Sequence, residues 1–287
     1  MKEFIYIVLS LIIIIFIATG PALAKNEEEN KPVVALALGG GAAWGFAHIG
    51  VLDLMEDYNI EPDLITGTSA GAVVAALYAD GMSPAEIEEL AADLNWRELL
   101  DAEVPDLGFF SPEGIEEFIK KNTAQDKFED SPIELAFVAS DLNTGHKVVL
   151  NSGSISRAVS ASAAIPVLYR PVEYGDRLLV DGGLTDNLPS ALAVEMGADI
   201  VIAVDLSSNF SYKGIPRNQF EVGIRSFNIL QQNNIDYEDI DILIQPNLDG
   251  YRGTEMDYYD EIIEKGREAA KAAFEEESEI IDNLKNE

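Results

Sequence analysis

Two short apolar runs near the start of the chain each end in a glycine-rich turn that leads into a stretch with helical spacing. The first run covers residues 33–38 and is followed by Gly39-Gly40-Gly41. The second covers residues 64–66 and is followed by a turn at residues 67–71. Short apolar runs bounded in this way are typical of buried strands, and parallel strands need a helical crossover between them. The pattern therefore predicts two strands, each followed by a helix.

Strand-like and helix-like segments keep alternating through the rest of the chain. Further strands are expected at residues 133–140, 147–150, 178–180, 199–204 and 242–244. Further helices are expected at residues 70–79, 111–121 and 189–196, after the capping box Ser83-Pro84-Ala85-Glu86, and in an acidic C-terminal segment with an apolar stripe from Tyr258 to Phe274. This alternation predicts an α/β fold with a mostly parallel sheet that helices cover on both faces.

The N-terminus has the pattern of an export signal. An almost unbroken apolar run at residues 4–18 follows Lys2 and precedes the small-x-small sequence Ala22-Leu23-Ala24, as in cleaved secretory signals. An uncleaved anchor is the alternative, because an apolar stretch extended to Ala24 approaches the roughly 20 residues of a membrane helix. We expect a signal peptide or anchor at residues 1–24, a linker at residues 25–32 and one domain at residues 33–287. The domain is then exported: secreted, periplasmic or associated with the cell envelope.

The charge balance and the absence of cysteine exclude several classes of function. The chain has 51 acidic and 19 basic residues, a net charge of −32, which would repel a nucleic-acid backbone. It has no cysteine, so disulfides, thiolate nucleophiles and cysteine-ligated metal centres are excluded. Only two histidines are available for acid–base chemistry.

The turn at residues 67–71 reads Gly-Thr-Ser-Ala-Gly, a G-x-S-x-G motif between a strand and an apolar helix. This is the setting of a nucleophile elbow, in which Gly67 and Gly71 let neighbouring backbone pass close and Ser69 lies at a helix N-terminus. The alternative is a glycine-rich turn in which Ser69 only caps the helix. The five residues by themselves leave both interpretations open.

The loop at residues 39–45 also joins a strand to a helix, so its backbone N–H groups can converge on an anion. A dinucleotide site would need G-x-G-x-x-G, but Trp44 or Ala42 occupies one of the glycine positions, depending on the frame. The acidic ribose ligand expected after the next strand is also missing. An oxyanion hole needs only backbone donors, which this loop can supply. Tight packing without a ligand is the remaining alternative.

A serine nucleophile needs a base, and the two histidines are poorly placed for that role. His146 lies in a predicted turn early in the chain, and His48 lies upstream of Ser69 on the first helix, as a buried or capping residue would. A Ser-His-Asp triad is therefore poorly supported.

Asp181 offers another base. It directly follows the predicted strand at residues 178–180 and precedes Gly182 and Gly183, and sites form at the carboxyl ends of parallel strands. A shielded carboxylate there could accept the serine proton directly. A plain turn role is the alternative for Asp181, and it is the interpretation we give to Asp176 and Asp186.

Five blocks, in this order along the chain, together resemble the patatin-like phospholipase family. They are LALGGGAAWGFAHIGVL at residues 36–52, GTSAG at 67–71, ASDLNTG at 139–145, ASAAIP at 161–166 and DGGLTDNLP at 181–189. The resemblance implies a lipid acyl hydrolase of the phospholipase A or lysophospholipase type on a three-layer α/β/α fold, without a metal or other cofactor. It implies that Ser69 is the nucleophile and Asp181 the base of a dyad, within a DGG motif completed by Gly182 and Gly183. The implied oxyanion hole is the loop of Gly39, Gly40, Gly41 and Ala42.

The glycine loop departs from the family pattern at two positions. The family commonly has G-G-G-G-x-R-G, whereas this chain has Ala42 at the fourth glycine and Trp44 at the arginine. No backbone N–H group is lost, but a bidentate phosphate partner is, so a neutral ester or a lysolipid becomes an alternative to an intact phospholipid. Trp44 could contact an acyl chain, lie at a lipid interface or simply pack.

Together the patterns predict an exported serine esterase whose partner is a lipid or fatty-acyl ester, with contact to a membrane surface and none to nucleic acid. Two alternatives stay open: a non-catalytic nucleotide- or anion-binding module, and a serine esterase for soluble esters. Whether residues 207–235 form a lid over the site is also left open.

Overall fold

The computed structural model describes residues 31–94, 101–102, 108–209, 214–216, 218–253 and 257–285. The chain from Pro32 to Glu287 forms a compact unit of its own. The signal peptide or anchor expected at residues 1–24, and most of the expected linker at residues 25–32, lie outside the described residues. No helix within the described ranges has both the length and the hydropathy needed to cross a bilayer.

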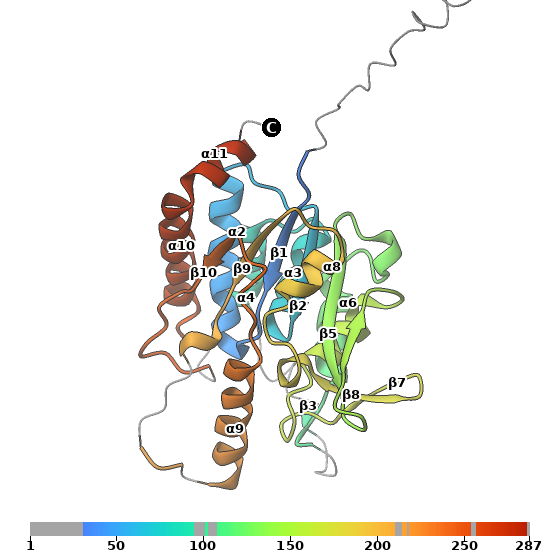
Figure 1. Ribbon diagram of the computed structural model, residues 1–287. Helices are drawn as coiled ribbons and strands as arrows, with labels where there is room; N and C mark the ends of the chain where they lie inside the picture. Colours follow the sequence, from blue (N-terminus) through green and yellow to red (C-terminus); the bar gives the residue numbers. More distant parts are fainter. Residues whose placement is uncertain are drawn as a thin grey trace, which may run out of the picture. The chain divides into compact units, whose positions relative to one another are not determined.

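An eight-stranded sheet organises this unit (Figure 1), in the order β10-β9-β1-β2-β5-β8-β7, with β6 also paired to β5. The strands are β1 (Val34–Leu38), β2 (Leu64–Thr68), β5 (Glu134–Asp141), β6 (Lys147–Leu150), β7 (Val172–Tyr174), β8 (Arg177–Asp181), β9 (Ile200–Val204) and β10 (Ile242–Ile244). The run from β10 to β5 is parallel, whereas β6, β7 and β8 join by antiparallel pairing. The mostly parallel sheet predicted from the sequence is therefore confirmed. A separate two-stranded sheet pairs β3 (Asp101–Ala102) with β4 (Phe110–Ser111).

Strand β1 lies in the middle of the parallel part and shows how the two faces of the sheet differ. It pairs with β2 on one side and with β9 on the other, and all five of its residues are buried. Because successive side chains point to opposite faces, Leu36 and Leu38 enter the main core, whereas Ala35 and Ala37 enter a smaller core on the other face. On the second face, these alanines pack with larger side chains, among them Leu64 and Leu188.

Helices cover both faces. The helical elements are η1 (Ala42–Phe46), α2 (Ala47–Asp57), α3 (Ala70–Ala79), α4 (Pro84–Ala92), α6 (Glu113–Asn122), η2 (Phe128–Asp130), α7 (Ile155–Ser162), η3 (Gly182–Leu184), α8 (Ser190–Glu195), η4 (Ser207–Asn209), α9 (Gln219–Asn233), α10 (Tyr259–Glu276) and α11 (Ser278–Lys285). Helices α2, α3, α6, α7 and α10 contribute side chains to the main core. The short helix α8 contributes Ala193 to the smaller core and lies on the other face (Figure 1).

Local signals placed most elements correctly, and tertiary context decided the rest. The predicted capping box is present at α4: Ser83 Oγ accepts the Glu86 N–H, and the Glu86 carboxylate accepts the Ser83 N–H. Strand β7 and helices α7 and α9 were not predicted. The hairpin of β7 and β8 turns at Gly175, whose φ of 63° is in the left-handed region that favours glycine.

Two glycines allow α2 and α10 to cross at close range. A Cβ on Gly50 would lie 1.9 Å from the carbonyl oxygen of Ile263, and a Cβ on Gly266 would lie 1.9 Å from that of Ala47. Both contacts are with backbone, so relief would require the helices to move apart. The helix that follows the glycine loop is thus held against the C-terminal helix by the absence of two side chains.

We expect Gly50→Ala to lower the free energy of unfolding by about 1–3 kcal/mol, because the added methyl group overpacks the crossing. The measurement is urea denaturation of the variant and the parent chain. Gly223→Ala is the matched control, since a Cβ there would meet only Val167 Cγ2, at 4.0 Å. In a helix, that change is expected to be neutral or stabilising. Equal midpoints for the two variants would contradict the packing argument.

Candidate active site

Ser69 lies at the sharp turn between β2 and α3. Its backbone has φ 54° and ψ −119°, a conformation that costs an L-residue energy and is typical of a strained strand-to-helix turn. The side chain is 3% exposed. The turn therefore holds a hydroxyl group in a nearly dry setting at the N-terminus of a helix, where developing negative charge is favoured.

Gly67 and Gly71 are required by close backbone contacts around this turn. A Cβ on Gly71 would lie 2.1 Å from the Leu38 carbonyl oxygen of β1, and a Cβ on Gly67 would lie 2.9 Å from Ala72 Cα. Neither neighbour is the flexible end of a side chain. The structure thus gives the two glycines of the G-x-S-x-G motif the packing role that the sequence predicted.

The Ser69 hydroxyl donates a hydrogen bond to Asp181 Oδ2 at 2.7 Å. The other carboxylate oxygen accepts the Gly183 N–H at 2.8 Å. Asp181 is fully buried, and this burial raises the pKa of its carboxyl group to about 7, against the opposing effect of the two hydrogen bonds. A carboxyl group with a pKa near neutrality, in contact with a hydroxyl group, is well matched to accept and return a proton.

Asp181 lies on a strand whose direction in the sheet was predicted incorrectly. We expected Asp181 at the carboxyl end of a parallel strand, but β8 runs antiparallel to β5. Along β5, Asp181 pairs with Ala139, directly after Val138, which pairs with Thr68 of β2. The two strands therefore approach the same level of the sheet from opposite directions, and this brings the carboxylate beside the serine.

The glycines after Asp181 fit into crowded space. A Cβ on Gly182 would lie 2.2 Å from the Val138 carbonyl oxygen, and a Cβ on Gly183 would lie 2.3 Å from Gln231 Nε2. With no side chain in the way, the Gly183 N–H can turn back onto the Asp181 carboxylate. Gly182 and Gly183 thus allow the backbone path that fixes the carboxylate.

The glycine loop passes directly beside the serine, since a Cβ on Gly40 would lie 3.2 Å from Ser69 Cβ. Two of its predicted oxyanion donors are already in use: the Gly39 N–H donates to the Val204 carbonyl at 3.1 Å and the Gly40 N–H to the Asn187 carbonyl at 3.0 Å. Gly39 and Gly40 are therefore corrected from donors to loop anchors. Within the described part of the chain, the N–H groups of Gly41 and Ala42 have no protein acceptor.

Three polar side chains hold this loop, and two of them, Asn187 and Gln231, were not predicted from the sequence. Asn187 Nδ2 donates to the Gly40 carbonyl at 3.3 Å, and Gln231 Nε2 of α9 donates to Asn187 Oδ1 at 2.8 Å. His48 Nε2 donates to the Gly39 carbonyl at 2.8 Å. Asn187 belongs to the block at residues 181–189 and could have been recognised there. Gln231 lies outside every motif, so only the fold could reveal it.

Ser162, at the end of α7, was also missed. Its hydroxyl accepts the Ser69 N–H at 2.9 Å and donates to the Val138 carbonyl at 2.6 Å. It belongs to the block at residues 161–166, which indicated the family but gave no role to this side chain. The hydroxyl anchors the backbone of Ser69 to strand β5.

None of the other titratable candidates has a hydrogen bond to Ser69 within the described residues. His48 is buried, and this burial lowers its pKa to about 4, so it is neutral near pH 7. His146 is exposed in the turn after β5. Asp176 is exposed in the β7–β8 turn, and Asp186 forms an ion pair with Lys147 at 3.1 Å. The structure therefore brings only Ser69 and Asp181 together among these candidates.

Trp44 is buried in the main core, so the packing interpretation holds and the lipid-interface interpretation is wrong for this residue. Ala42, at the family's fourth glycine position, has a φ of 49°. This alanine therefore occupies a left-handed conformation that glycine would adopt without strain.

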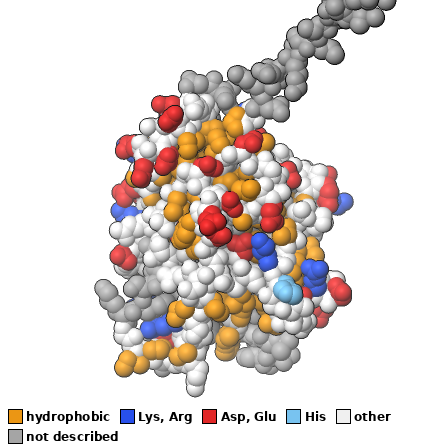
Figure 2. All heavy atoms as spheres, viewed as in Figure 1, with side chains coloured by type: hydrophobic (Ala, Val, Ile, Leu, Met, Phe, Trp, Pro, Cys, Tyr) orange, Lys and Arg blue, Asp and Glu red, His pale blue; other side chains and the backbone are white. Residues whose placement is uncertain are grey.

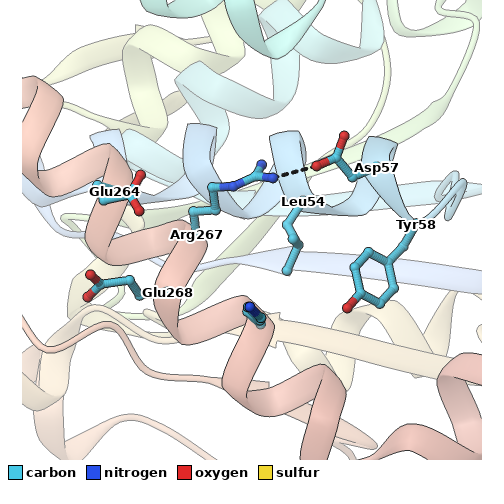
Figure 3. A pocket seen from close by; sticks show the side chains of 7 residues that line it. Leu54, Asp57, Tyr58, Glu264, Arg267 and Glu268 are labelled. Atoms are coloured by element: carbon cyan, nitrogen blue, oxygen red, sulfur yellow. Dashed lines mark hydrogen bonds and ion pairs between the residues drawn. The ribbon is translucent and has the colours of Figure 1, made fainter.

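A surface cavity lies away from Ser69, between α2 and α10 (Figure 3). It has a volume of 430 Å³, and Arg267 of α10 reaches across it to Asp57 of α2. Its other lining side chains are Leu54, Tyr58, Glu264, Glu268 and Lys271. The cavity is bordered by solvated charges and contains none of the candidate catalytic residues. Over the described ranges, no three histidine or acidic side chains cluster as metal ligands.

Comparisons with known proteins agree with the geometry. A sequence model described as "Patatin-like phospholipase" matches residues 36–194, more than half of the chain. An NTE family protein of Mycobacterium tuberculosis is 36% identical over 192 residues, which cover 66% of this chain and 53% of the relative. The human patatin-like phospholipase domain-containing protein 6 is 34% identical over 187 residues, covering 61% of this chain and 13% of that protein. The chain thus spans about half the length of its mycobacterial relative.

The fold also has a counterpart among solved structures. The crystal structure of VipD from Legionella pneumophila matches with a TM-score of 0.60 and 13% sequence identity, over 86% of this chain and 67% of that chain. At this identity, the match supports the fold alone.

We expect Ala42→Gly to raise the free energy of unfolding by up to about 1.5 kcal/mol. Removing the Cβ relieves the left-handed strain, about 1–2 kcal/mol, and this outweighs the entropy that glycine adds to the unfolded chain, about 0.4–1 kcal/mol. Urea denaturation measures the difference. Ala43→Gly, on the next residue of the same turn, is the matched control and should destabilise. A loss of stability in Ala42→Gly would contradict the strain argument.

Proposed function

This chain belongs to the patatin-like phospholipase family, and on that premise we propose that it is a serine hydrolase of lipid acyl esters that uses a Ser69–Asp181 dyad. The observation that carries the proposal is the 2.7 Å hydrogen bond from the Ser69 hydroxyl to the buried Asp181 carboxylate. A non-catalytic anion-binding module would not need this contact. In addition, the N–H groups of Gly39 and Gly40, which such a module would use to bind the anion, already donate to backbone carbonyls.

The first half of the reaction forms an acyl-enzyme. Ser69 Oγ attacks the ester carbonyl carbon while its proton passes to Asp181. The carbonyl oxygen becomes an oxyanion, which the N–H groups of Gly41 and Ala42 can stabilise as preorganised donors. When the tetrahedral intermediate collapses, the ester C–O bond breaks, and the alcohol leaves with the proton from Asp181. The acyl group remains on Ser69.

The second half uses water in place of serine. Asp181 takes a proton from the water molecule as it attacks the acyl-enzyme, and the same N–H groups stabilise the second oxyanion. Collapse returns the proton to Ser69 Oγ and releases the fatty acid. Each step moves one proton between Asp181 and an oxygen atom, so no histidine is needed.

The substrate class follows from the loop and from the family. The glycine loop has no arginine to pair with a phosphate group. The proposed substrates therefore include neutral acyl esters and lysolipids as well as intact phospholipids. We also propose that the hydrolase domain is exported, with residues 1–24 acting either as a cleaved signal peptide or as an uncleaved anchor. No nucleic-acid partner is proposed, because the net charge is −32.

A long-chain fluorophosphonate is expected to add once to the protein, at Ser69, as measured by intact mass. The adduct should be lost in Ser69→Ala and kept in Ser152→Ala, which removes an exposed serine as the matched control. Asp181→Asn should lower the rate of labelling roughly 10²–10⁴-fold, the usual contribution of a positioned base. Labelling of Asp181→Asn at the parental rate would leave the nucleophile in place but exclude the dyad.

The pH dependence of kcat/KM on a soluble ester should follow the ionisation of Asp181. The carboxylate must be deprotonated to take the serine proton, so activity should rise with pH through an apparent pKa of about 7 and then level off. The same raised pKa means that the folded state holds a proton that the unfolded chain, with a value near 3.8, has released. The stability contribution of Asp181 is therefore lost as pH rises between those values. An activity inflection near pH 4 would contradict the role of burial.

A further inference from the structure

Helix α9 has an inner face that reaches the candidate site and an outer face that carries exposed apolar side chains. On the inner face, Phe227 and Gln231 are buried, and Gln231 bonds to Asn187 beside the glycine loop. On the outer face, Ile229 is 57% exposed and Leu230 is 46% exposed. These two residues directly precede Gln231, so the apolar surface begins next to the candidate site.

A second exposed apolar segment borders the first turns of α9. A Cβ on Gly223 would contact Val167 Cγ2, and Val167 is 48% exposed. Val167 lies three residues after Ala164, whose carbonyl accepts the Asp181 N–H at 2.9 Å. The Phe109 N–H donates to the Leu168 carbonyl, which places a further exposed apolar residue beside Val167. The exposed apolar side chains are therefore close in sequence to two segments of the candidate site: Val167 to Ala164, which bonds to Asp181, and Leu230 to Gln231, which bonds to Asn187.

The acidic residues of the chain avoid these segments. Residues 206–235 contain one acidic residue, Glu221, and three basic ones, whereas the whole chain has 51 acidic residues among 287. Residues 142–172 contain no acidic residue and three basic ones. Glu221 is paired with Arg225 at 2.6 Å. Figure 2 shows apolar side chains both over the upper part of the molecule and at the end where α9 lies in Figure 1, and the acidic side chains lie mainly away from the α9 end.

We propose that this α9 face docks on the surface of a phospholipid bilayer. We define the α9 face as Phe109, Val167, Ile215, Val222, Ile229 and Leu230, all exposed. Exposed apolar side chains on a helix that lies in the interface gain free energy by burial in the acyl boundary. The scarcity of acidic residues in these segments means that few carboxylates would have to be desolvated there. The proposal rests on the proposed function, because it gives Ser69 a route to acyl esters held in a lipid surface.

The charge pattern selects lipid over a second copy of the chain as the occupant. Two copies, each with a net charge of −32, would repel each other, whereas a zwitterionic bilayer has no net charge to oppose docking. The acidic surface then stays in water, while the acid-poor face meets the headgroups. A carboxylate on this face would be costly to desolvate, and the paired Glu221 is its only acidic residue over residues 206–235.

Site-directed fluorescence tests the docking itself. The chain has no cysteine, so one introduced cysteine can carry an environment-sensitive dye on the full-length protein. In a Ser69→Ala background, which cannot consume the lipid, dyes at Ile229→Cys and Val222→Cys should shift to the blue when phosphatidylcholine vesicles are added. A dye at Val194→Cys, an exposed site on α8, is the matched control and should not shift. Equal shifts at all three positions, or none at position 229, would overturn the proposal.

Hydrolysis supplies the second arm and separates this proposal from the proposed function. For the active chain, Ile229→Asp combined with Leu230→Asp should lower the ratio of the rate on phosphatidylcholine vesicles to the rate on a soluble ester by roughly tenfold, since two interfacial apolar contacts are lost. Val194→Asp is the control and should leave the ratio unchanged. An unchanged ratio in the double variant would overturn docking while the hydrolase stands. If the dyes shift to the blue but the parent chain hydrolyses neither the vesicle lipid nor the soluble ester, the result would support docking and contradict the proposed function. Dimerisation that the double variant abolishes, without a vesicle effect, would assign the face to a second copy.

Discussion

The hydrogen bond between Ser69 and Asp181 depends on dense backbone packing around it, and much of the local sequence follows from that requirement. Gly71 lets β1 pass within contact of the turn, and Gly182 lets β5 pass within contact of the strand end that carries the carboxylate. Ser162 then fixes the backbone of the serine. Water is excluded because these chains approach so closely, and the dry setting is what raises the pKa of the carboxyl group. The motif glycines thus act on the chemistry through packing.

The sequence predicted this site better than it predicted the path of the chain to it. Ser69 and its turn could be identified because a strained strand-to-helix turn needs glycines at fixed positions. Asp181 does lie beside Ser69, but the premise for placing it there was mistaken, since the antiparallel direction of β8 comes from the β7–β8 hairpin and leaves no mark in the run at residues 178–180. Gly39 and Gly40 were assigned to the oxyanion because sequence identifies N–H groups but cannot show which distant carbonyls already bind them.

Helix α9 shows where local pattern fails most clearly. Among the side chains of α9 that the structure describes, only Phe227 and Gln231 are fully buried, so the apolar periodicity that identifies a core helix is weak. Its exposed apolar residues further obscure the pattern. The contact of Gln231 with Asn187 spans 44 residues of sequence and depends on the packing of α9 against η3. Helix α9 is stabilised by contacts with η3 and Asn187, which are distant in sequence, so its position could be found only from the fold.

The smaller core, to which Ala35 and Ala37 of β1 contribute, limits which substitutions the protein can tolerate. Leu188 packs in the smaller core, and the residue before it, Asn187, binds the glycine loop through both its carbonyl and its side chain. The smaller core therefore fixes the position of the glycine loop through Leu188 and Asn187. A larger side chain at Ala35 or Ala37 would press on Leu188 and shift Asn187, so these positions are constrained by the placement of the glycine loop beside Ser69 as well as by stability. Neutral drift should be slower on this face than its distance from the serine would suggest.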